Sequence, residues 1–329
     1  MERVRYPVRE SHTRLSSGNT WTARANQRLR KAGKRMSRHW QLYLLIAPVL
    51  LYFLIFHYWP MYGLQIAFKD FIGTKGIRDS PWVGLKHFER FFDSYFFWRL
   101  IGNTLGISLY ELIAGFPLPI MIALMINEVR QQRMRKFVQI VTYAPHFLST
   151  VVVVGVVIMF LSPTTGIVNT VIRAFGGESI YFMTKPEWFK SIYVWSGVWQ
   201  QMGWNSIIYI AALAGIDPQL HEAARVDGAS RLRRIWHINL PGIRSTIVIL
   251  LILNTGSLMG VGFEKIFLMQ NSLNKESSDV IATYVYSSGI LGSQYSFAAA
   301  VGLFNSVVNF ILLLLVNRTS KYLNQASLW

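Results

Sequence analysis

Six apolar stretches, each long enough to cross a lipid bilayer, constrain this chain more than any other feature of its sequence. They cover residues 41–63, 101–126, 137–162, 193–215, 245–269 and 294–316. A helix of about 20 apolar residues spans the roughly 30 Å of hydrocarbon in a bilayer. Because backbone amides find no water there, each stretch must close its hydrogen bonds within a helix. The sequence therefore predicts an all-α integral membrane protein with six transmembrane helices.

The composition supports this prediction and limits the chemistry. Of 329 residues, 52% are hydrophobic and only 15% are charged, whereas a soluble domain has about 25% charged residues. The absence of cysteine removes disulfides, thiolate metal sites and cysteine nucleophiles. The seven histidines show no metal-ligand spacing, and no phosphate-binding loop of the Walker type is present. We expect no catalytic residue, no metal site and no cofactor bound by this chain.

The orientation follows from Lys and Arg, which accumulate in cytoplasmic loops. With the amino terminus inside, the inner segments hold 22 of the 33 basic residues and the outer segments hold 10, over nearly equal lengths. The corresponding net charges are +16 inside and +2 outside. Both termini are therefore predicted to be cytoplasmic. Topology and anionic lipid explain the formal charge of +17, so nucleic-acid binding is not expected.

This topology predicts three parts: a basic cytoplasmic segment 1–40, a six-span domain 41–316 and a cytoplasmic tail 317–329. The basic segment is too long for a signal peptide, and the apolar run after it is long enough to span. Residues 23–38 fit either a basic helix on the membrane surface or a disordered basic tail. The sequence alone leaves both open.

The cytoplasmic loop 216–244 has more local design than a linker needs. Asp217 and Pro218 fit an N-cap and the first helical position, and Gly228 stands where a left-handed residue ends a helix. Ser230 fits the cap of a second short helix, expected to end before Pro241. A solvated basic loop is the alternative. Three arginines in the first turn oppose the helix dipole, which indicates contact with phospholipid or an acidic partner: Arg231, Arg233 and Arg234.

The loop reads Glu222-Ala223-Ala224-Arg225-Val226-Asp227-Gly228-Ala229, then eight residues, then Ile238-Asn239-Leu240-Pro241. This pattern and spacing resemble the EAA motif of ATP-binding-cassette importer permeases. Segments 60–63, 66–71, 82–85 and 279–287 are similar to the sugar-permease branch that handles oligosaccharides derived from polysaccharides. The resemblance covers about residues 40–320.

The resemblance implies that the loop forms a coupling helix docked on a separate ATP-hydrolysing subunit. Glu222 would pair with a basic residue there, Ala223 and Ala224 would permit close packing, and Gly228 would set the corner. Other motif positions are Asp227, Ala229, Leu240 and Pro241.

The resemblance also implies a set of partners. They are a second homologous permease, a dimer of ATPase subunits holding ATP and Mg, an extracytoplasmic solute-binding protein, an oligosaccharide and membrane lipid. The expected location is the bacterial cytoplasmic membrane. The substrate suggested by the resemblance is an acidic oligosaccharide such as alginate.

Amides and tryptophans within the fourth and fifth spans suggest a substrate path. Amides can bond sugar hydroxyls, and aromatic rings can stack on sugar C–H faces. Helix–helix contacts are the alternative reading. The candidates are Gln200, Gln201, Trp204, Asn205, Asn254 and Ser257.

Three charged residues within the spans carry separate expectations. Glu111 lies in the middle of the second span, where an ionisable group suggests function, although a structural role is favoured. Glu264 and Lys265 are expected at a solvated outer helix end, and contact with a substrate-delivery protein is the alternative.

Two other classes of membrane protein compete with the importer permease. An ion-coupled secondary transporter of sugars would need intramembrane carboxylates in two repeated halves of the chain. Glu111 is the one candidate for such a carboxylate in this sequence. A membrane-embedded enzyme would need clustered His, Asp or Glu, which the sequence lacks. The sequence therefore favours a permease subunit driven by a separate ATPase.

Overall fold

The computed structural model describes residues 39–322. These residues form helices and connecting segments, with one isolated antiparallel bridge between Lys69 and Trp82. The basic region 23–38 and residues 323–329 lie outside the described part of the chain. The chain divides into two compact units, 1–63 and 64–329, which are described separately.

The first unit contains a long apolar helix. α2 (Trp40–Phe53) continues through a π-helical turn (Leu54–Tyr58) into α3 (Trp59–Met61). A 3-10 turn (Tyr62–Phe68) follows and crosses the boundary between the two units in the sequence. The π turn immediately precedes the segment that contains Pro60, which has no N–H to donate to the helix ladder. Residues Trp40–Phe68 are long and apolar enough to cross a membrane, and they cover the first predicted span.

The second unit is a set of packed helices. Three short non-α turns interrupt it, a 3-10 turn at Ala144–Phe147 and π turns at Ile235–Asn239 and Ser287–Leu291. Its α-helices are α4 (Gly76–Asp79), α5 (Lys86–Phe92), α6 (Phe97–Gly115), α7 (Pro117–Glu128), α8 (Gln132–Tyr143), α9 (Thr150–Phe160), α10 (Ile167–Ala174), α11 (Pro186–Ala214), α12 (Pro218–Val226), α13 (Arg231–Arg234), α14 (Leu240–Gly242), α15 (Arg244–Thr255), α16 (Phe263–Met269), α17 (Lys275–Ser278), α18 (Ile281–Tyr286) and α19 (Tyr295–Tyr322).

α11 is the central helix of this unit and packs against α6, α7, α8, α9, α15 and α17. Its fully buried Val194 lies in one apolar cluster with Ile107 of α6 and Ile266 of α16. A second cluster joins α5, α6, α18 and α19, with Phe91, Leu100 and Ile281 among its buried members. Burying apolar side chains between helices holds these elements together.

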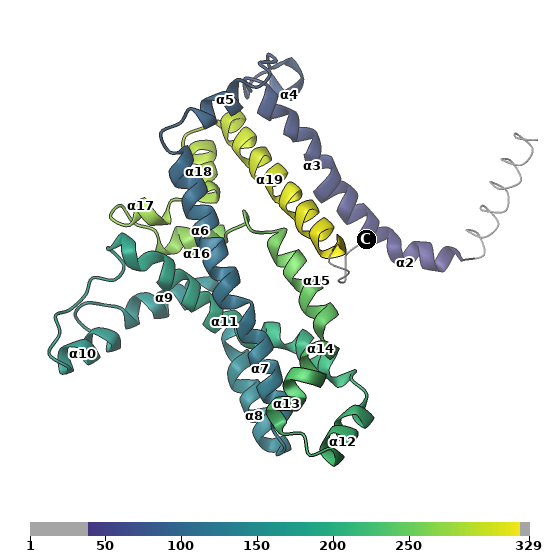
Figure 1. Cartoon of the computed structure of the whole chain (residues 1–329). Coiled ribbons are helices and arrows are strands. Elements are labelled where there is room, and N and C mark those ends of the chain that lie inside the picture. The colour runs from purple at the N-terminus through teal and green to yellow at the C-terminus, as the bar shows by residue number, and fades with distance from the viewer. Residues whose placement is uncertain (1–38, 323–329) are drawn as a thin grey trace, which may run out of the picture. The chain divides into compact units, whose positions relative to one another are not determined.

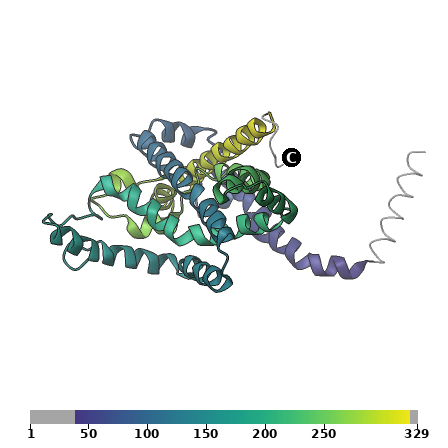
Figure 2. The same ribbon diagram turned by 60° about the horizontal axis from the view of Figure 1, so that its bottom comes forward.

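The two ends of the second unit differ in the elements they carry. Figure 1 shows α7, α8, α12 and α13 gathered at one end and α5 at the other. The segment that carries α10 lies at the periphery in both views (Figures 1 and 2). The predicted cytoplasmic loop thus lies beside the α7–α8 connection, which the topology also places inside.

Helices cover all six predicted stretches, but not as six uniform rods. Within the described residues, three helices are long and apolar enough to span: Trp40–Phe68, Phe97–Glu128 and Tyr295–Tyr322. Two bent pairs also pass the test if each counts as one span, with bends of 100° between α8 and α9 and 61° between α14 and α15. α11 is 29 residues long but is not among them, and its amides and tryptophans account for a lower hydropathy.

The fifth predicted stretch is broken. α15 ends at Thr255, residues 256–262 form no α-helix, and α16 begins at Phe263. Three glycines within seven residues weaken the helix there. Irregular backbone at membrane depth is tolerated where it lines a cavity, and this segment lines one.

Candidate functional site

The loop 216–244 has the predicted helix caps. Asp217 Oδ1 accepts a hydrogen bond from the Gln219 N–H at 2.9 Å, and α12 starts at Pro218. At the other end Gly228 has φ +71°, its N–H donates to Arg225 O at 3.1 Å, and the next N–H donates to Ala224 O at 2.9 Å. This pair of bonds is a Schellman motif, which fixes the corner after α12.

α12 presents an exposed surface. Glu222, Ala223, Asp227 and Gly228 are exposed, whereas Ala224 and Ala229 are half-buried. No hydrogen bond or ion pair engages the Glu222 carboxylate within the described residues. Apolar side chains are also exposed on the same loop, at Leu220, Val226, Leu232 and Trp236. Such a surface suits a protein partner.

One of the three arginines does not face outward as expected. Arg231 and Arg233 are exposed, but Arg234 forms an ion pair with Glu128 of α7, with 3.8 Å between Nη2 and Oε2. Arg234 also donates from Nη1 to Ala229 O at 3.3 Å. This arginine therefore joins the loop to α7, and the expected contact with lipid or a partner is wrong for this residue.

The second helix of the loop does not end before Pro241. It passes through the π turn Ile235–Asn239 into α14, where Leu240 is half-buried and Pro241 is exposed. The π turn shifts the hydrogen-bond pattern just before the proline, so the missing N–H costs no regular α-helical bond. Asn239 is fully buried, and its amide atoms have no hydrogen-bond partner among the described residues.

A cavity of about 420 Å³ lies between α6, α7, α11, α15 and the broken segment. Four of the six predicted substrate-path residues line it: Gln201, Asn205, Asn254 and Ser257. Within the wall, Asn254 Nδ2 donates to Leu250 O at 2.7 Å and Ser257 Oγ donates to Asn254 O at 2.9 Å. The amide oxygen of Asn254 is thus left to accept a further bond.

The other two predicted residues lie outside the cavity lining. Gln200 is buried and donates from Nε2 to Leu148 O at 3.0 Å, a contact between α11 and the α8–α9 connection. Trp204 stacks on His146 with ring centroids 4.2 Å apart. His146 Nδ1 lies 2.9 Å from Gln201 Oε1, so this histidine positions a cavity residue. Its local sequence, between a proline and a phenylalanine, gives no signal of this contact.

The described cavity lining contains little charge. Glu111 is the one charged residue among the described lining residues, and the rings of Tyr193 and Tyr209 also reach the cavity. Lys265 is buried rather than solvated, with 9% of its surface exposed, while Glu264 is exposed as expected. Lys265 Nζ donates to Tyr193 O at 2.7 Å and lies 4.6 Å from the centre of the Tyr193 ring.

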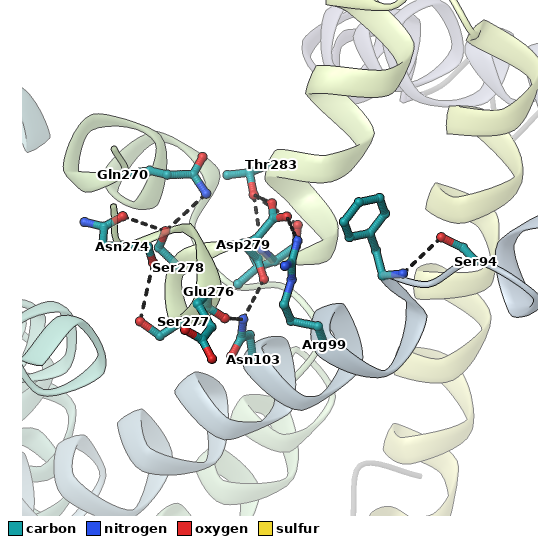
Figure 3. A network of polar contacts seen from close by, with 12 residues as sticks. Ser94, Arg99, Asn103, Gln270, Asn274, Glu276, Ser277, Ser278, Asp279 and Thr283 are labelled. Carbon is teal, nitrogen blue, oxygen red and sulfur yellow. Dashed lines mark hydrogen bonds and ion pairs between the residues drawn. The ribbon is translucent and has the colours of Figure 1, made fainter. Parts of the chain in front are cut away.

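A polar network fixes the segment 270–283 against α6 (Figure 3). Arg99 pairs with Asp279 at 3.1 Å, and Asn103 Nδ2 donates to Glu276 O at 2.8 Å and to Asp279 O at 3.0 Å. Ser277 Oγ donates to Pro186 O, the first residue of α11, at 2.6 Å. Sequence reasoning missed this network because its partners lie more than 90 residues apart. It holds the starts of α6 and α11 together.

Within the described residues, no group of three or more His, Asp or Glu side chains could hold a metal ion. The cavity offers amides, hydroxyls, aromatic rings and the Glu111 carboxylate, and groups of these kinds can hydrogen-bond or stack on a polyhydroxylated solute.

Comparison with known proteins agrees with this geometry. Residues 115–321 match the family model described as binding-protein-dependent transport system inner membrane component. The chain is 46% identical over 288 residues to the polygalacturonan/rhamnogalacturonan transport system permease protein YteP of Bacillus subtilis (strain 168), which covers 88% of this chain and 90% of that protein. Protein LplB of the same organism is also 46% identical over 288 residues, covering 88% of this chain and 91% of that protein.

A solved structure is similar over nearly the whole chain. It is a bacterial alginate ABC transporter in complex with an alginate pentasaccharide-bound periplasmic protein. Its matching chain is 44% identical, with a TM-score of 0.83 over 90% of this chain and 99% of that chain. These findings confirm the predicted resemblance to sugar-importer permeases and the all-helical membrane fold. The chain belongs to the family of binding-protein-dependent transport system inner membrane components.

Proposed function

We propose that this permease subunit imports acidic oligosaccharides derived from a polysaccharide, driven by a separate ATPase that docks on α12. One observation carries the proposal. α11 and α15 both line the cavity, through Gln201 and Asn254, and the same two helices flank the exposed α12–α14 segment. Motion of that segment would therefore reach the substrate path directly.

The rigidity of the segment supports a mechanical role. The Asp217 cap and the Schellman motif at Gly228 fix both ends of α12, and Arg234 ties α13 to α7. When two ATPase subunits close on ATP and Mg, a docked α12 would move as a body. Glu222 would pair with a basic residue of the ATPase, and Ala223 would allow close approach. Asp227, Ala229, Leu240 and Pro241 would hold the corner and its connection to α15.

The proposed assembly places six helical spans in the bacterial cytoplasmic membrane with both termini in the cytoplasm. The distribution of Lys and Arg supports this orientation. The positive charge of the predicted inner segments would suit anionic inner-leaflet lipid. A second, homologous permease would complete the translocation path. An extracytoplasmic solute-binding protein would deliver the oligosaccharide.

The acidic substrate class rests on the relatives and on the cavity. Two of the relatives named above belong to transport systems for polygalacturonan or rhamnogalacturonan and for alginate. The amides of Gln201, Asn205 and Asn254, with the hydroxyl of Ser257, suit the hydroxyls of a sugar. The lysine behind the cavity wall offers a charge for a carboxylate.

Uptake by the complete importer in proteoliposomes tests the driving force. Uptake of labelled trigalacturonate or an alginate trisaccharide should persist when ionophores dissipate ion gradients and should stop without ATP. The opposite result would favour an ion-coupled secondary transporter.

Variants of α12 test the docking role. Glu222→Lys and Gly228→Asp should remain inserted in the membrane but hydrolyse ATP without transport. Gln219→Lys places a lysine on the same helix about one turn earlier without removing a carboxylate, and serves as the control for adding a positive charge. Normal uptake in both variants would refute a coupling role for this helix.

A further inference from the structure

We propose that Lys265 is the carboxylate-binding group of the translocation cavity and that Glu111 holds its ammonium in the absence of substrate. This inference rests on the acidic substrate class proposed above. It assigns a role to two charged residues that sequence reasoning placed elsewhere, one in a structural role and one at a solvated helix end.

Lys265 is buried and has few hydrogen-bond partners within the described part of the chain. Its side chain is buried, yet Tyr193 O is the one hydrogen-bond acceptor that its ammonium has among the described residues. An ammonium has three N–H donors. A buried cation retains a large desolvation cost unless a counter-charge lies near. Lys265 therefore has donors to offer to an incoming anion.

A glycine in the cavity wall lies next to both charged groups. Gly197 lines the cavity, and a Cβ added there would lie 3.0 Å from Lys265 Nζ and 3.6 Å from Glu111 Oε1. The ammonium and the carboxylate thus meet at the point of the wall where no side chain intervenes. Gly197 leaves a window through which a substrate carboxylate can reach Lys265.

Glu111 and Lys265 lie close to each other without a direct bond. Glu111 and Lys265 converge beside Gly197, but no ion pair or hydrogen bond joins them within the described residues. Charges separated by a few ångströms in a poorly solvated site still attract strongly. Glu111 would keep the ammonium charged and in place when the cavity is empty. A uronate carboxylate in direct contact would then replace the more distant Glu111 as its partner.

Glu111 also limits the affinity. It is the single charged lining residue described, and it repels an anionic sugar that has paired with Lys265. A transport site must release its substrate, so a nearby like charge favours passage over tight binding. This predicts opposite effects for the loss of each partner.

The test is uptake by the complete reconstituted importer, with trigalacturonate or an alginate trisaccharide, whichever the wild type takes up. Lys265→Met should reduce uptake at low substrate about 30-fold or more, because truncating one side of a buried charge pair has effects of that size. Lys265→Arg should keep most of the uptake. Glu111→Gln should retain uptake with a lower KM.

A purely structural ion pair gives a different pattern. Both single variants would then be equally harmful, and the double variant Glu111→Gln/Lys265→Met would recover, because removing both charges leaves neither buried and unpaired. That recovery, or wild-type uptake by Lys265→Met, would overturn the inference. The expected result is that the double variant stays as poor as Lys265→Met.

A substitution in the cavity wall tests the inference without changing Lys265 or Glu111. Gly197→Ala should place a methyl group against the Lys265 ammonium and reduce uptake about 10-fold. Gly102→Ala is the matched control, since nothing lies within 4 Å of the Cβ it would add to α6. Unchanged uptake in Gly197→Ala would contradict the window. If the wild-type importer instead moved only the carboxyl-reduced neutral trisaccharide, the proposed substrate class itself would be wrong.

Discussion

Arg234 of α13 lies 3.8 Å from Glu128, the last residue of α7, and this ion pair joins the exposed α12–α14 segment to a helix that lines the cavity. The two side chains are 12% and 21% exposed, so solvent and salt screen the pair less than a surface pair. The bond from Arg234 to Ala229 O holds the same arginine against the corner after α12. The loop therefore has a third attachment besides its chain connections to α11 and α15.

Breaking this attachment should reduce coupling more than it reduces stability. Arg234→Met removes both the ion pair with Glu128 and the hydrogen bond to Ala229 O. We expect transport per ATP hydrolysed to fall several-fold while the protein still inserts. Arg244→Met, exposed at the start of α15 and without an ion pair among the described residues, is the control. The exchange Glu128→Arg/Arg234→Glu should restore part of the coupling. Equal ratios of uptake to hydrolysis in Arg234→Met and wild type would exclude this role.

The corner at Gly228 should tolerate few side chains. A φ of +71° costs an ordinary residue about 1–2 kcal/mol, while asparagine enters this region more readily. Gly228→Val should therefore lower the thermal stability of the α12 segment and the rate of uptake, and Gly228→Asn should do so less. Hydrogen exchange of α12 amides in the purified complex measures the effect. Equal protection in both variants would show that the left-handed corner does not matter.

Local features of the candidate site were predictable from the sequence because short-range rules govern them. The Asp217 cap, the Ser230 cap and the glycine corner each depend on residues within five positions of one another. The apolar stretches were predictable for a similar reason, since their length and composition alone indicate spanning helices. Helical spacing also places Gln201 and Asn205 on one face of α11, and both line the cavity.

The remaining features of the site depend on packing between residues that are far apart in the sequence. Whether Gln200 or Gln201 faces the cavity depends on the rotation of α11 against its neighbours, which helical spacing does not give. The burial of Lys265 depends on its contact with Tyr193 of α11, across the break that follows Thr255. The Arg234–Glu128 pair joins residues more than 100 positions apart. None of these contacts has a signal within its own segment.

The segment between the first two predicted spans contains a pH-sensitive contact. Asp70 accepts a hydrogen bond from Lys86 Nζ at 2.7 Å, and His87 Nε2 lies 3.0 Å from its other oxygen. The Lys86 ammonium holds the pKa of the Asp70 carboxyl below its ordinary value of 3.8, against a smaller opposing effect of desolvation, and His87 adds a still smaller lowering effect. A lowered folded-state pKa contributes stability above the ordinary pKa and loses it as the pH falls through the folded value.

Thermal unfolding of the complex at different pH values measures this contribution. Asp70→Asn should unfold at a lower temperature than wild type at pH 7, and the difference should shrink below about pH 4. Asp79→Asn, exposed and without an ion pair among the described residues, should show no such dependence. A difference that grew on acidification would mean that the Asp70 carboxylate does not stabilise the folded protein.

Substitutions of the two adjacent glutamines of α11 should have different effects, one on stability and the other on substrate binding. Gln200 is buried and donates to Leu148 O, so Gln200→Ala leaves that carbonyl unpaired at a cost of about 1–3 kcal/mol. We expect a lower unfolding temperature and less protein in the membrane, with an unchanged KM for the protein that remains. Gln201 lines the cavity and contacts His146, so Gln201→Ala should raise the KM for the oligosaccharide with little loss of protein. A raised KM in Gln200→Ala at normal stability would mean that α11 is rotated so that Gln200, rather than Gln201, faces the cavity.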